Sequence, residues 1–415
     1  MRVPPRHRAW ALLVWGGYAL VLALAPLVFD SSLALTMLSQ IGIAIVACLA
    51  FNLLLGQGGM LSFGHAVYSG LGAYAAIHSL RWIAAGELAL PVSLVPLVGG
   101  LGGLAGAATL GWLTTRTAGT PFAMITLGLG ELVAALALMF PTVFGGEGGL
   151  SADRVVGAPV WGISFGPAWQ VYALIAVYCF ACTAAMYGFT RTPLGRMLNA
   201  VRDNPLRTEF VGYSARRVRY LAFVVSGFFM GVAGGLAALH FEIVSAEVLG
   251  ALRSGAYLLF TVLGGTAYFA GPVIGAVLMV LAGVLLSALT RAWLLYLGLA
   301  FILVVMAAPG GLAGVAASLA RAAAAGRLRR LWAGLLALLA LAVIALTGLA
   351  VLVELLYRRQ LDAASGPVLN FAGLPLQLDS ADAWVGAVLL LATAAALFEL
   401  ARRRFAPQWA QEAAR

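Results

Sequence analysis

Long apolar runs, separated by short polar or glycine-rich stretches, recur along almost the whole chain. Most contain about 20 residues, the length that an α-helix needs to cross the hydrocarbon core of a bilayer. The pattern predicts an all-α polytopic membrane bundle, with about ten core transmembrane segments and two C-terminal ones. The expected segments lie near 10–29, 33–55, 60–80, 91–113, 121–140, 169–189, 219–240, 255–270, 272–290, 292–308, 331–353 and 383–400.

The composition agrees with this pattern and removes several kinds of chemistry. The chain is 63% hydrophobic and only 10% charged, whereas soluble domains are about 25% charged. Its net charge of +10 comes from arginine, because the sequence contains no lysine. A P-loop and a Schiff-base enzyme each need a lysine, so both are excluded. The basic residues belong to loops, which indicates membrane topology and not binding of nucleic acid.

The cysteines and histidines show no catalytic or metal-binding pattern. Cys179 and Cys182 lie three residues apart in an apolar run, where a pair of small packing residues is favoured over a redox or metal pair. The four histidines are scattered and form no H-E-x-x-H motif. The sequence therefore predicts a protein that is not an enzyme and needs no metal or cofactor.

Arginines orient the expected helices. They gather at the N-terminus, at 190–218, at 316–330 and in the C-terminal tail, and twelve crossings place all four on the cytoplasmic side. The loop at 354–382 fits less well, because it contains arginines and faces outward. The first apolar run is longer than the core of a signal peptide, and Pro26 follows the only plausible cleavage site, so a retained first helix is expected.

The segment 56–76 breaks the apolar pattern with six glycines and several polar residues. Irregular backbone at membrane depth is tolerated only where protein buries it or where it lines a wet cavity. Two interpretations stay open, a wall of a solute pathway or a short loop with tight packing. A similar Gly-Gly-x-x-x-Phe sequence recurs at 264–269, as in transporters built from repeats. The pathway candidates are Gln57, Gly58, Gly59, Ser62, His65, Tyr68, Gly264 and Gly265.

Other glycines and one carboxylate add further candidates. Gly227, Gly231 and Gly235 are spaced by four residues, which is typical of close helix packing either between subunits or within one. Glu131 lies in the middle of the run at 121–140, so it is a pathway candidate or a partner in a hydrogen bond between helices. The glycine-rich stretch at 145–149 is either an outer contact or a turn.

One loop predicts an amphipathic helix at the inner face. Thr192 is a plausible N-cap, Pro193 suits the first helical position, and Asn204-Pro205 should end the helix. Its apolar stripe consists of Leu194, Met197, Leu198 and Val201, and Arg196, Asn199 and Asp203 are expected on the opposite face. From these residues alone, the helix either lies on lipid or docks on another subunit.

Several motifs in order resemble one family, the LivM-type membrane subunits of ABC importers for branched-chain amino acids. They cover about residues 10–312. The motifs are F-N-L-L-L-G-Q-G-G-M-L-S-F-G-H-A-V-Y-S-G-L-G-A-Y (51–74), T-L-G-L-G-E-L (126–132), F-G-G-E-G-G-L (144–150), R-T-P-L-G-R-M-L-N-A-V-R-D-N-P (191–205), V-G-Y-S (211–214), A-F-V-V-S-G-F-F-M-G-V-A-G-G-L (222–236) and V-L-G-G-T-A-Y-F-A-G-P-V-I-G-A (262–276).

The resemblance implies a permease that works by alternating access in a bacterial inner membrane, with both termini cytoplasmic. It implies three kinds of partner besides lipid: a second homologous permease, two ATP-binding cassette subunits and an extracytoplasmic solute-binding protein. The inner helix would couple to the ATPase through Leu194, Gly195, Arg196, Met197, Leu198, Ala200, Val201 and Arg202.

The chain also departs from the family pattern. Met60, Ser245-Ala246, Ala267 and Tyr268 replace the residues usual in that family, so urea, amides or sugars stay open as substrates. A self-powered secondary transporter is the alternative of another class. The expected domains are a permease domain at 1–312, a basic linker at 313–330 and an extension with two transmembrane helices at 331–415.

Overall fold

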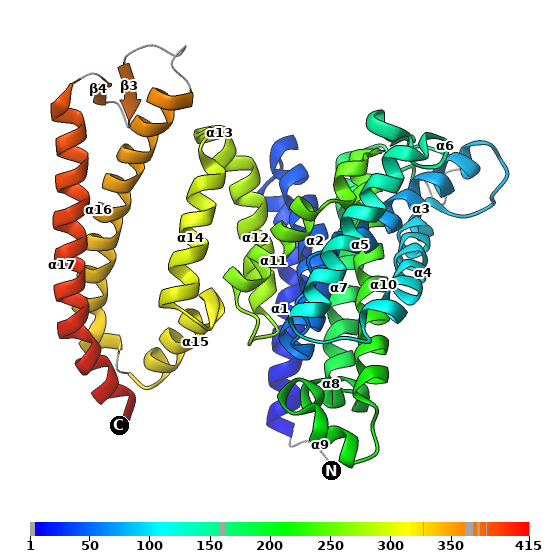
Figure 1. The fold of residues 1–415 in the computed structure, drawn as a ribbon, viewed down its shortest axis with the longest axis horizontal. Helices are drawn as coiled ribbons and strands as arrows, with labels where there is room; N and C mark the ends of the chain where they lie inside the picture. Colours follow the sequence, from blue (N-terminus) through cyan, green and yellow to red (C-terminus); the bar gives the residue numbers. More distant parts are fainter. Residues whose placement is uncertain are drawn as a thin grey trace. The chain divides into compact units, whose positions relative to one another are not determined.

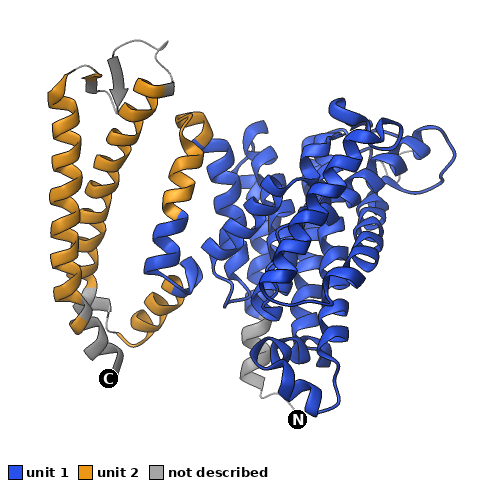
Figure 2. Cartoon of the chain, viewed as in Figure 1, with its two compact units in different colours: residues 1–286, 301–314 blue, residues 287–300, 315–415 orange. Residues whose placement is uncertain are grey.

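The computed structural model describes residues 5–157, 163–326, 328–361, 368–371, 374–378 and 380–414. It divides the chain into two compact units. Unit 1 comprises residues 1–286 and 301–314, and unit 2 comprises 287–300 and 315–415 (Figure 2). The topology prediction rests partly on side chains that lie outside the described part: Arg2, Arg6, Arg8, Arg327, Arg329 and Arg330.

Unit 1 is a helical bundle, because its apolar runs favour helices and its glycines, prolines and polar residues gather at their ends. Its first half comprises α1 (Pro5–Val28), α2 (Ser32–Asn52), η1 (Leu53–Gln57), α3 (Ala66–Ala84), η2 (Val92–Leu94), α4 (Val95–Thr114), α5 (Thr120–Met139), α6 (Pro141–Phe144), η3 (Gly146–Gly148) and β1 (Leu150–Ser151). Its second half comprises α7 (Ala168–Arg191), α8 (Pro193–Asp203), α9 (Pro205–Phe210), α10 (Ala215–Phe241), β2 (Ile243–Val244), η4 (Ala246–Leu249), α11 (Ala251–Gly264), α12 (Gly271–Leu281) and η5 (Ala282–Leu286).

The predicted fold class is confirmed, since each of the twelve apolar segments is helical. Among the described residues, eight helices are long and apolar enough to cross a membrane, or nine if α14 and α15 form one bent span. Helix α11 is shorter, with 14 residues, and ends at Gly264, as the half-helix prediction requires. Helices α8 and α9 lie at one end of unit 1 and α6 lies at the other (Figure 1).

Helix α10 lies at the centre of unit 1 and packs on α2, α3 and α4. Glycines make the contact with α4 close. A Cβ on Gly231 would lie 2.4 Å from the Gly99 carbonyl oxygen, and one on Gly103 would lie 2.4 Å from that of Gly227. The repeated glycines therefore serve packing within one subunit, which was the second of the two predicted roles.

The expected helix at 60–80 begins later than predicted. Its first turn is missing because Gly59 adopts a positive φ of 63°, and the backbone runs irregularly until α3 begins at Ala66. The second Gly-Gly sequence behaves alike: α11 ends at Gly264, and Gly265 has a φ of 114°. Only glycine adopts such angles readily, so the sequence repeat corresponds to a repeated break in the backbone. We call residues 58–65 the first break and 265–270 the second break.

Unit 2 is a helical hairpin joined to the preceding short helices. Its elements are α13 (Ser287–Leu289), parts of α14 (Trp293–Ala307) and α15 (Gly311–Ala324), α16 (Leu328–Leu361), β3 (Val368–Phe371), β4 (Leu374–Gln377) and α17 (Ala381–Ala414). Strands β3 and β4 pair antiparallel between the two long helices, with Val368 opposite Gln377.

Helix α16 corrects the expected loop at 354–382. No glycine or proline interrupts the chain between Gly348 and Gly366, so the helix continues to Leu361 and includes Glu354. The Glu354 carboxylate accepts a hydrogen bond from Thr290 and one of 3.2 Å from the Tyr296 hydroxyl. This membrane-depth carboxylate is therefore satisfied inside unit 2, as such groups require.

Candidate functional site

Helix α2 ends in a π-helical turn, η1, that leads into the first break. The Gly59 and Met60 amides donate to the carbonyl oxygens of Leu55 and Leu54, at 3.0 and 2.9 Å, and these bonds close the turn. π-Helical turns are rare and frequently occur at functional sites. The break therefore begins with an unusual but hydrogen-bonded element.

The first break lies inside unit 1, and side chains from distant helices satisfy its backbone. The Phe63 amide donates to Thr126 Oγ1 of α5 at 3.2 Å, and the Ala66 amide donates to Ser254 Oγ of α11 at 2.9 Å. The second bond satisfies an amide in the first turn of α3, where no partner within the helix exists. The irregular backbone is thus buried in protein, one of the two conditions for its occurrence at membrane depth.

His65 is a hydrogen-bonded packing residue. The Ser226 hydroxyl donates to the Ala50 carbonyl oxygen at 2.6 Å, so His65 Nε2 must donate to Ser226 Oγ at 2.8 Å. The imidazole ring is fully buried, edge-on to Tyr68 and to two phenylalanines. Ser62 Oγ and His65 Nδ1 have no hydrogen-bond partner within the part of the chain that the structure describes. Ser62, His65 and Tyr68 therefore lie in the protein core.

Helix α8 forms as the sequence predicts. The Thr192 hydroxyl accepts from the Gly195 amide at 3.2 Å, Pro193 occupies the first turn, and the helix ends at Asp203. Its apolar stripe faces the bundle: Leu198 and Val201 are buried, and Leu194 and Met197 pack beside them. Gly195 is also buried, because a Cβ there would lie 2.3 Å from the carbonyl oxygen of the last turn of α7.

Asn199 corrects the expected division of faces. It does not point away from the stripe, since its Nδ2 donates to Gln57 Oε1 at 3.0 Å. Arg202, one helical turn along the same face, donates from Nη1 to the Gly56 carbonyl oxygen at 2.5 Å. Two α8 side chains therefore bind the π-helical turn directly. Arg196 is exposed, as predicted, and Asp203 is exposed beside Arg202.

An exposed apolar surface beside α8 was not predicted. It comprises residues of α9 and of the turn that follows, and we call it the inner apolar patch: Leu206 (66% exposed), Phe210 (91%), Val211 (74%) and Tyr213 (46%). The signal was present in the sequence P-L-R-T-E-F-V, where leucine and phenylalanine stand four residues apart. Clustered exposed apolar side chains commonly mark a surface for another protein or for lipid.

The second break reaches the π-helical turn that precedes the first break at a single glycine, Gly56. A Cβ on Gly56 would lie 2.4 Å from the Thr266 carbonyl oxygen and 2.3 Å from Asn52 Oδ1. Gly265 packs equally closely on Gly310, because a Cβ on Gly265 would lie 2.4 Å from the Gly310 carbonyl oxygen. Tyr268, one of the residues that departs from the family pattern, is 38% exposed beyond this contact.

Glu131 lies on an exposed position of α5 and joins that helix to α11. Its Oε1 accepts from the Ala251 amide at 3.1 Å, at the first residue of α11. A carboxylate stabilises the positive end of a helix dipole and satisfies an amide that lacks a partner within the helix. The interhelical hydrogen bond expected as one alternative is present, and the side chain stays accessible.

The end of unit 1 opposite α8 is an ordered loop. Strand β1 pairs with β2, and Arg81 donates from Nε and Nη2 to the Ser151 carbonyl oxygen at 3.0 and 2.9 Å. Arg154 donates to the Phe165 carbonyl oxygen at 2.8 Å and pairs with Glu242 at 3.7 Å. The glycine stretch at 145–149 is a turn within this loop, in line with the simpler of its two expected roles.

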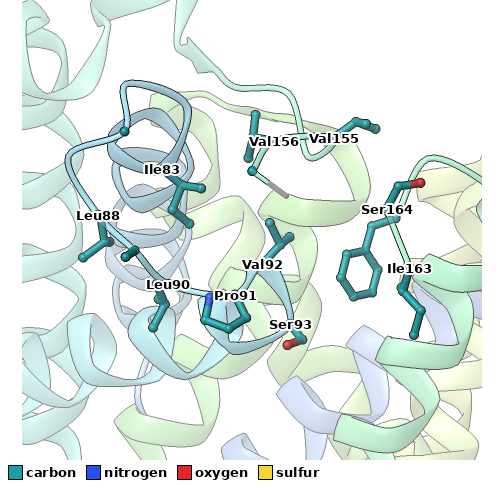
Figure 3. Close-up of a pocket in the computed structure, with 14 residues that line it drawn as sticks. Ile83, Leu88, Leu90, Pro91, Val92, Ser93, Val155, Val156, Ile163 and Ser164 are labelled. Carbon is teal, nitrogen blue, oxygen red and sulfur yellow. The ribbon is translucent and has the colours of Figure 1, made fainter. Parts of the chain in front are cut away.

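A pocket of about 530 Å³ lies at the same end of unit 1, between the loop after α3 and the loop before α7 (Figure 3). Apolar side chains form most of its wall, including Ile83, Leu90 and Val92, and Ser93 and Ser164 contribute polar atoms. Such a wall suits an apolar group rather than a charged one.

In the described part of the chain, no three His, Cys, Asp or Glu side chains come together to hold a metal ion.

Comparison with known proteins identifies the family and relatives of this chain. Residues 33–290 match the family model described as branched-chain amino acid transport system / permease component. The chain belongs to this family. Its membership makes the protein a multi-pass membrane permease of a transport system, as the sequence motifs predicted. The matched residues include both breaks, α8, α9 and the central helix α10.

Two curated relatives agree with the family model. The chain is 28% identical over 292 residues to the high-affinity branched-chain amino acid transport system permease protein LivM of Escherichia coli (strain K12), over 65% of this chain and 67% of that protein. It is also 28% identical over 291 residues to the protein of the same name from Salmonella typhimurium (strain LT2), with the same coverage. No solved structure matches the chain significantly.

Proposed function

We propose that this chain is one membrane-spanning permease subunit of an ATP-driven importer, and that it moves branched-chain amino acids across the inner membrane by alternating access. The family match and the names of both relatives support this proposal. A second homologous permease, two ATP-binding cassette subunits and an extracytoplasmic solute-binding protein complete the machine. The chain itself carries out no covalent chemistry.

The observation that carries the proposal is that α8 is bound to the bundle beside an exposed apolar surface. Leu198 and Val201 fix one face of α8 to the bundle, and Asn199 and Arg202 bind the π-helical turn. The exposed Arg196 and the inner apolar patch stay available for an ATP-binding cassette subunit. A helix that merely lay on lipid would present its apolar stripe to the membrane, whereas here that stripe is used inside the subunit.

The same arrangement divides four of the predicted pathway residues into two groups. Ser62, His65 and Tyr68 hold the first break in place from inside the core. Glu131 is accessible, on a helix whose neighbouring positions are largely exposed. We assign the solute pathway to the face of α5 that carries Glu131, where a second permease subunit would close it. The cytoplasm then lies on the side of α8 and α9, and both termini are cytoplasmic.

Uptake by membrane vesicles tests the proposal. Vesicles that contain this permease and its partner subunits should accumulate labelled leucine only when ATP is supplied, and an ionophore should not abolish uptake. Unlabelled isoleucine and valine should compete, whereas urea should not. Uptake that needs no ATP and collapses with the ionophore would establish the secondary transporter instead. ATP-driven uptake of urea without uptake of leucine would keep the importer and change its substrate.

A further inference from the structure

The contacts of Gly56 connect three parts of unit 1 that are far apart in the sequence. Its carbonyl oxygen binds Arg202 of α8, and its Cα lies against the Thr266 carbonyl of the second break. Its neighbour Gln57 binds Asn199 of α8. We propose that this junction passes the movement of α8 to both breaks, so that Gln57, Asn199 and Arg202 are positioning residues for transport. The inference rests on the proposed function, because it requires that an ATP-hydrolysing subunit moves α8.

The first step is the attachment of α8 to the π-helical turn. Asn199 and Arg202 lie three residues apart and therefore project from one side of α8. The Asp203 carboxylate lies 3.0 Å from Arg202 Nη2 and accepts from its Nε, which orients the guanidinium and leaves Nη1 for the Gly56 carbonyl oxygen. One neutral and one charge-assisted hydrogen bond thus join α8 to two consecutive residues of the turn.

The second step is the lack of free space between the two elements. A Cβ on Gly58 would lie 3.1 Å from Leu198 Cδ1, and one on Gly59 would lie 2.8 Å from Arg202 Cγ. The backbone of the first break is therefore in contact with both side chains. Because packed interiors resist compression, a displacement of α8 cannot be absorbed locally and must move the turn.

The third step leads from the turn to the second break. Gly56 has no side chain to separate it from Thr266, and Gly265 has none to separate it from Gly310. Glycine also allows the two ends of the second break to pack closely, because a Cβ on Gly271 would lie 1.9 Å from the Gly265 carbonyl oxygen. Side-chain hydrogen bonds thus join α8 to the π-helical turn, and close backbone contacts join that turn to the second break.

A purely structural role for the same contacts makes a different prediction. Arg202 satisfies a carbonyl group at the C-terminal end of α2, where helices leave such groups without partners. If the contacts only stabilised the fold, their loss would lower the amount of assembled transporter and change uptake and ATP hydrolysis in proportion. If they transmit movement, their loss lowers the ratio of solute transported to ATP hydrolysed.

The test uses the whole transporter, assembled from this permease and its partner subunits in proteoliposomes with labelled leucine as the probe. The measured quantity is the number of leucine molecules taken up for each ATP hydrolysed. Gln57→Ala and Asn199→Ala should each lower this ratio about threefold to tenfold, the factor that one neutral hydrogen bond contributes to an equilibrium. The double variant should lose no more than either single variant, because both remove the same contact. The exchanged pair Gln57→Asn with Asn199→Gln should restore the ratio.

Gly56→Ala tests the next contact, since its methyl group would collide with the Thr266 carbonyl and Asn52. Gly188→Ala is the matched control, because no atom outside its own helix lies within 4 Å of a Cβ there. This control should keep the wild-type ratio.

The outcomes separate the inference from the proposed function. An unchanged ratio in both alanine variants overturns the inference, and so do losses that multiply in the double variant. A wild-type transporter without ATP-driven leucine uptake overturns the proposed function, and the inference with it. Coupled uptake by the wild type together with uncoupled variants and a restored exchanged pair supports both. If Gly56→Ala fails to assemble, the Gln57 and Asn199 variants still decide the question.

Discussion

Phe210 offers a direct test of the proposed docking of an ATP-binding cassette subunit on the inner apolar patch. Its side chain is 91% exposed at the end of α9, within that patch. Burial of an exposed phenylalanine in an interface stabilises a complex by about 1.5–3 kcal/mol. Phe210→Ala should therefore weaken binding of that subunit about 10-fold to 100-fold. The stability of the permease itself should stay within about 0.5 kcal/mol, because an exposed side chain makes few contacts to lose.

The assay is a binding isotherm of the labelled ATP-binding subunit with permease held in nanodiscs, so that lipid covers the membrane-facing surface in every variant. Phe140→Ala is the matched control: this phenylalanine is 53% exposed but lies between α5 and α6. Helix α6 is at the opposite end of unit 1 from α8 and α9 (Figure 1). The affinity of this control should equal that of the wild type. An unchanged affinity for Phe210→Ala would refute the docking of the subunit on the inner apolar patch.

Three further substitutions probe the bundle, α8 and α5. Gly231→Ala should destabilise unit 1 by about 1–3 kcal/mol, because its methyl group would overlap the Gly99 carbonyl. Thermal unfolding in detergent should show this loss of stability for Gly231→Ala and no loss for the control Gly188→Ala. Arg196→Glu should abolish ATP-driven uptake while the amount of protein in the membrane stays normal. Gly195→Asp should instead reduce that amount on immunoblots, because this glycine packs against Phe189. Glu131→Ala should lower the thermal stability by about 0.5–2 kcal/mol. Glu131→Gln should keep that stability, because its amide oxygen still accepts from the Ala251 amide. Loss of uptake in the Gln variant would establish a role for the charge.

Local signals gave most of the helices, and the ends of some of them, correctly. The capping residue Thr192, Pro193 and Asn204-Pro205 bounded α8, because caps and proline act on the adjacent backbone alone. The two Gly-Gly sequences marked both breaks, since only glycine adopts their positive φ angles readily. The end of α16 was wrong because charged residues were taken as the sign of a loop, whereas arginine and glutamate also favour helices.

Contacts between distant segments were beyond the reach of such signals. The hydrogen bond from Asn199 to Gln57 joins residues 142 positions apart, and the Glu131 contact with Ala251 joins residues 120 apart. Helical periodicity assigned Asn199 to the polar face, but it could not show that α2 ends beside that face. In the same way, polarity made His65 a pathway candidate, whereas its place beside Ser226 is set by how α3 packs on α10.

The ordered loop at the end of unit 1 opposite α8 has a consequence for how a gate at that end can work. Arg81 and Arg154 hold it to α3 and α10, and two strand residues pair it with the chain after α10. A flap that swings open alone would have to break these bonds together. Under the proposed function, entry of a solute at this end calls for tilting of whole helices with the loop carried along as a rigid rim, and a bulky label placed on that rim should report the tilt of α3 and α10.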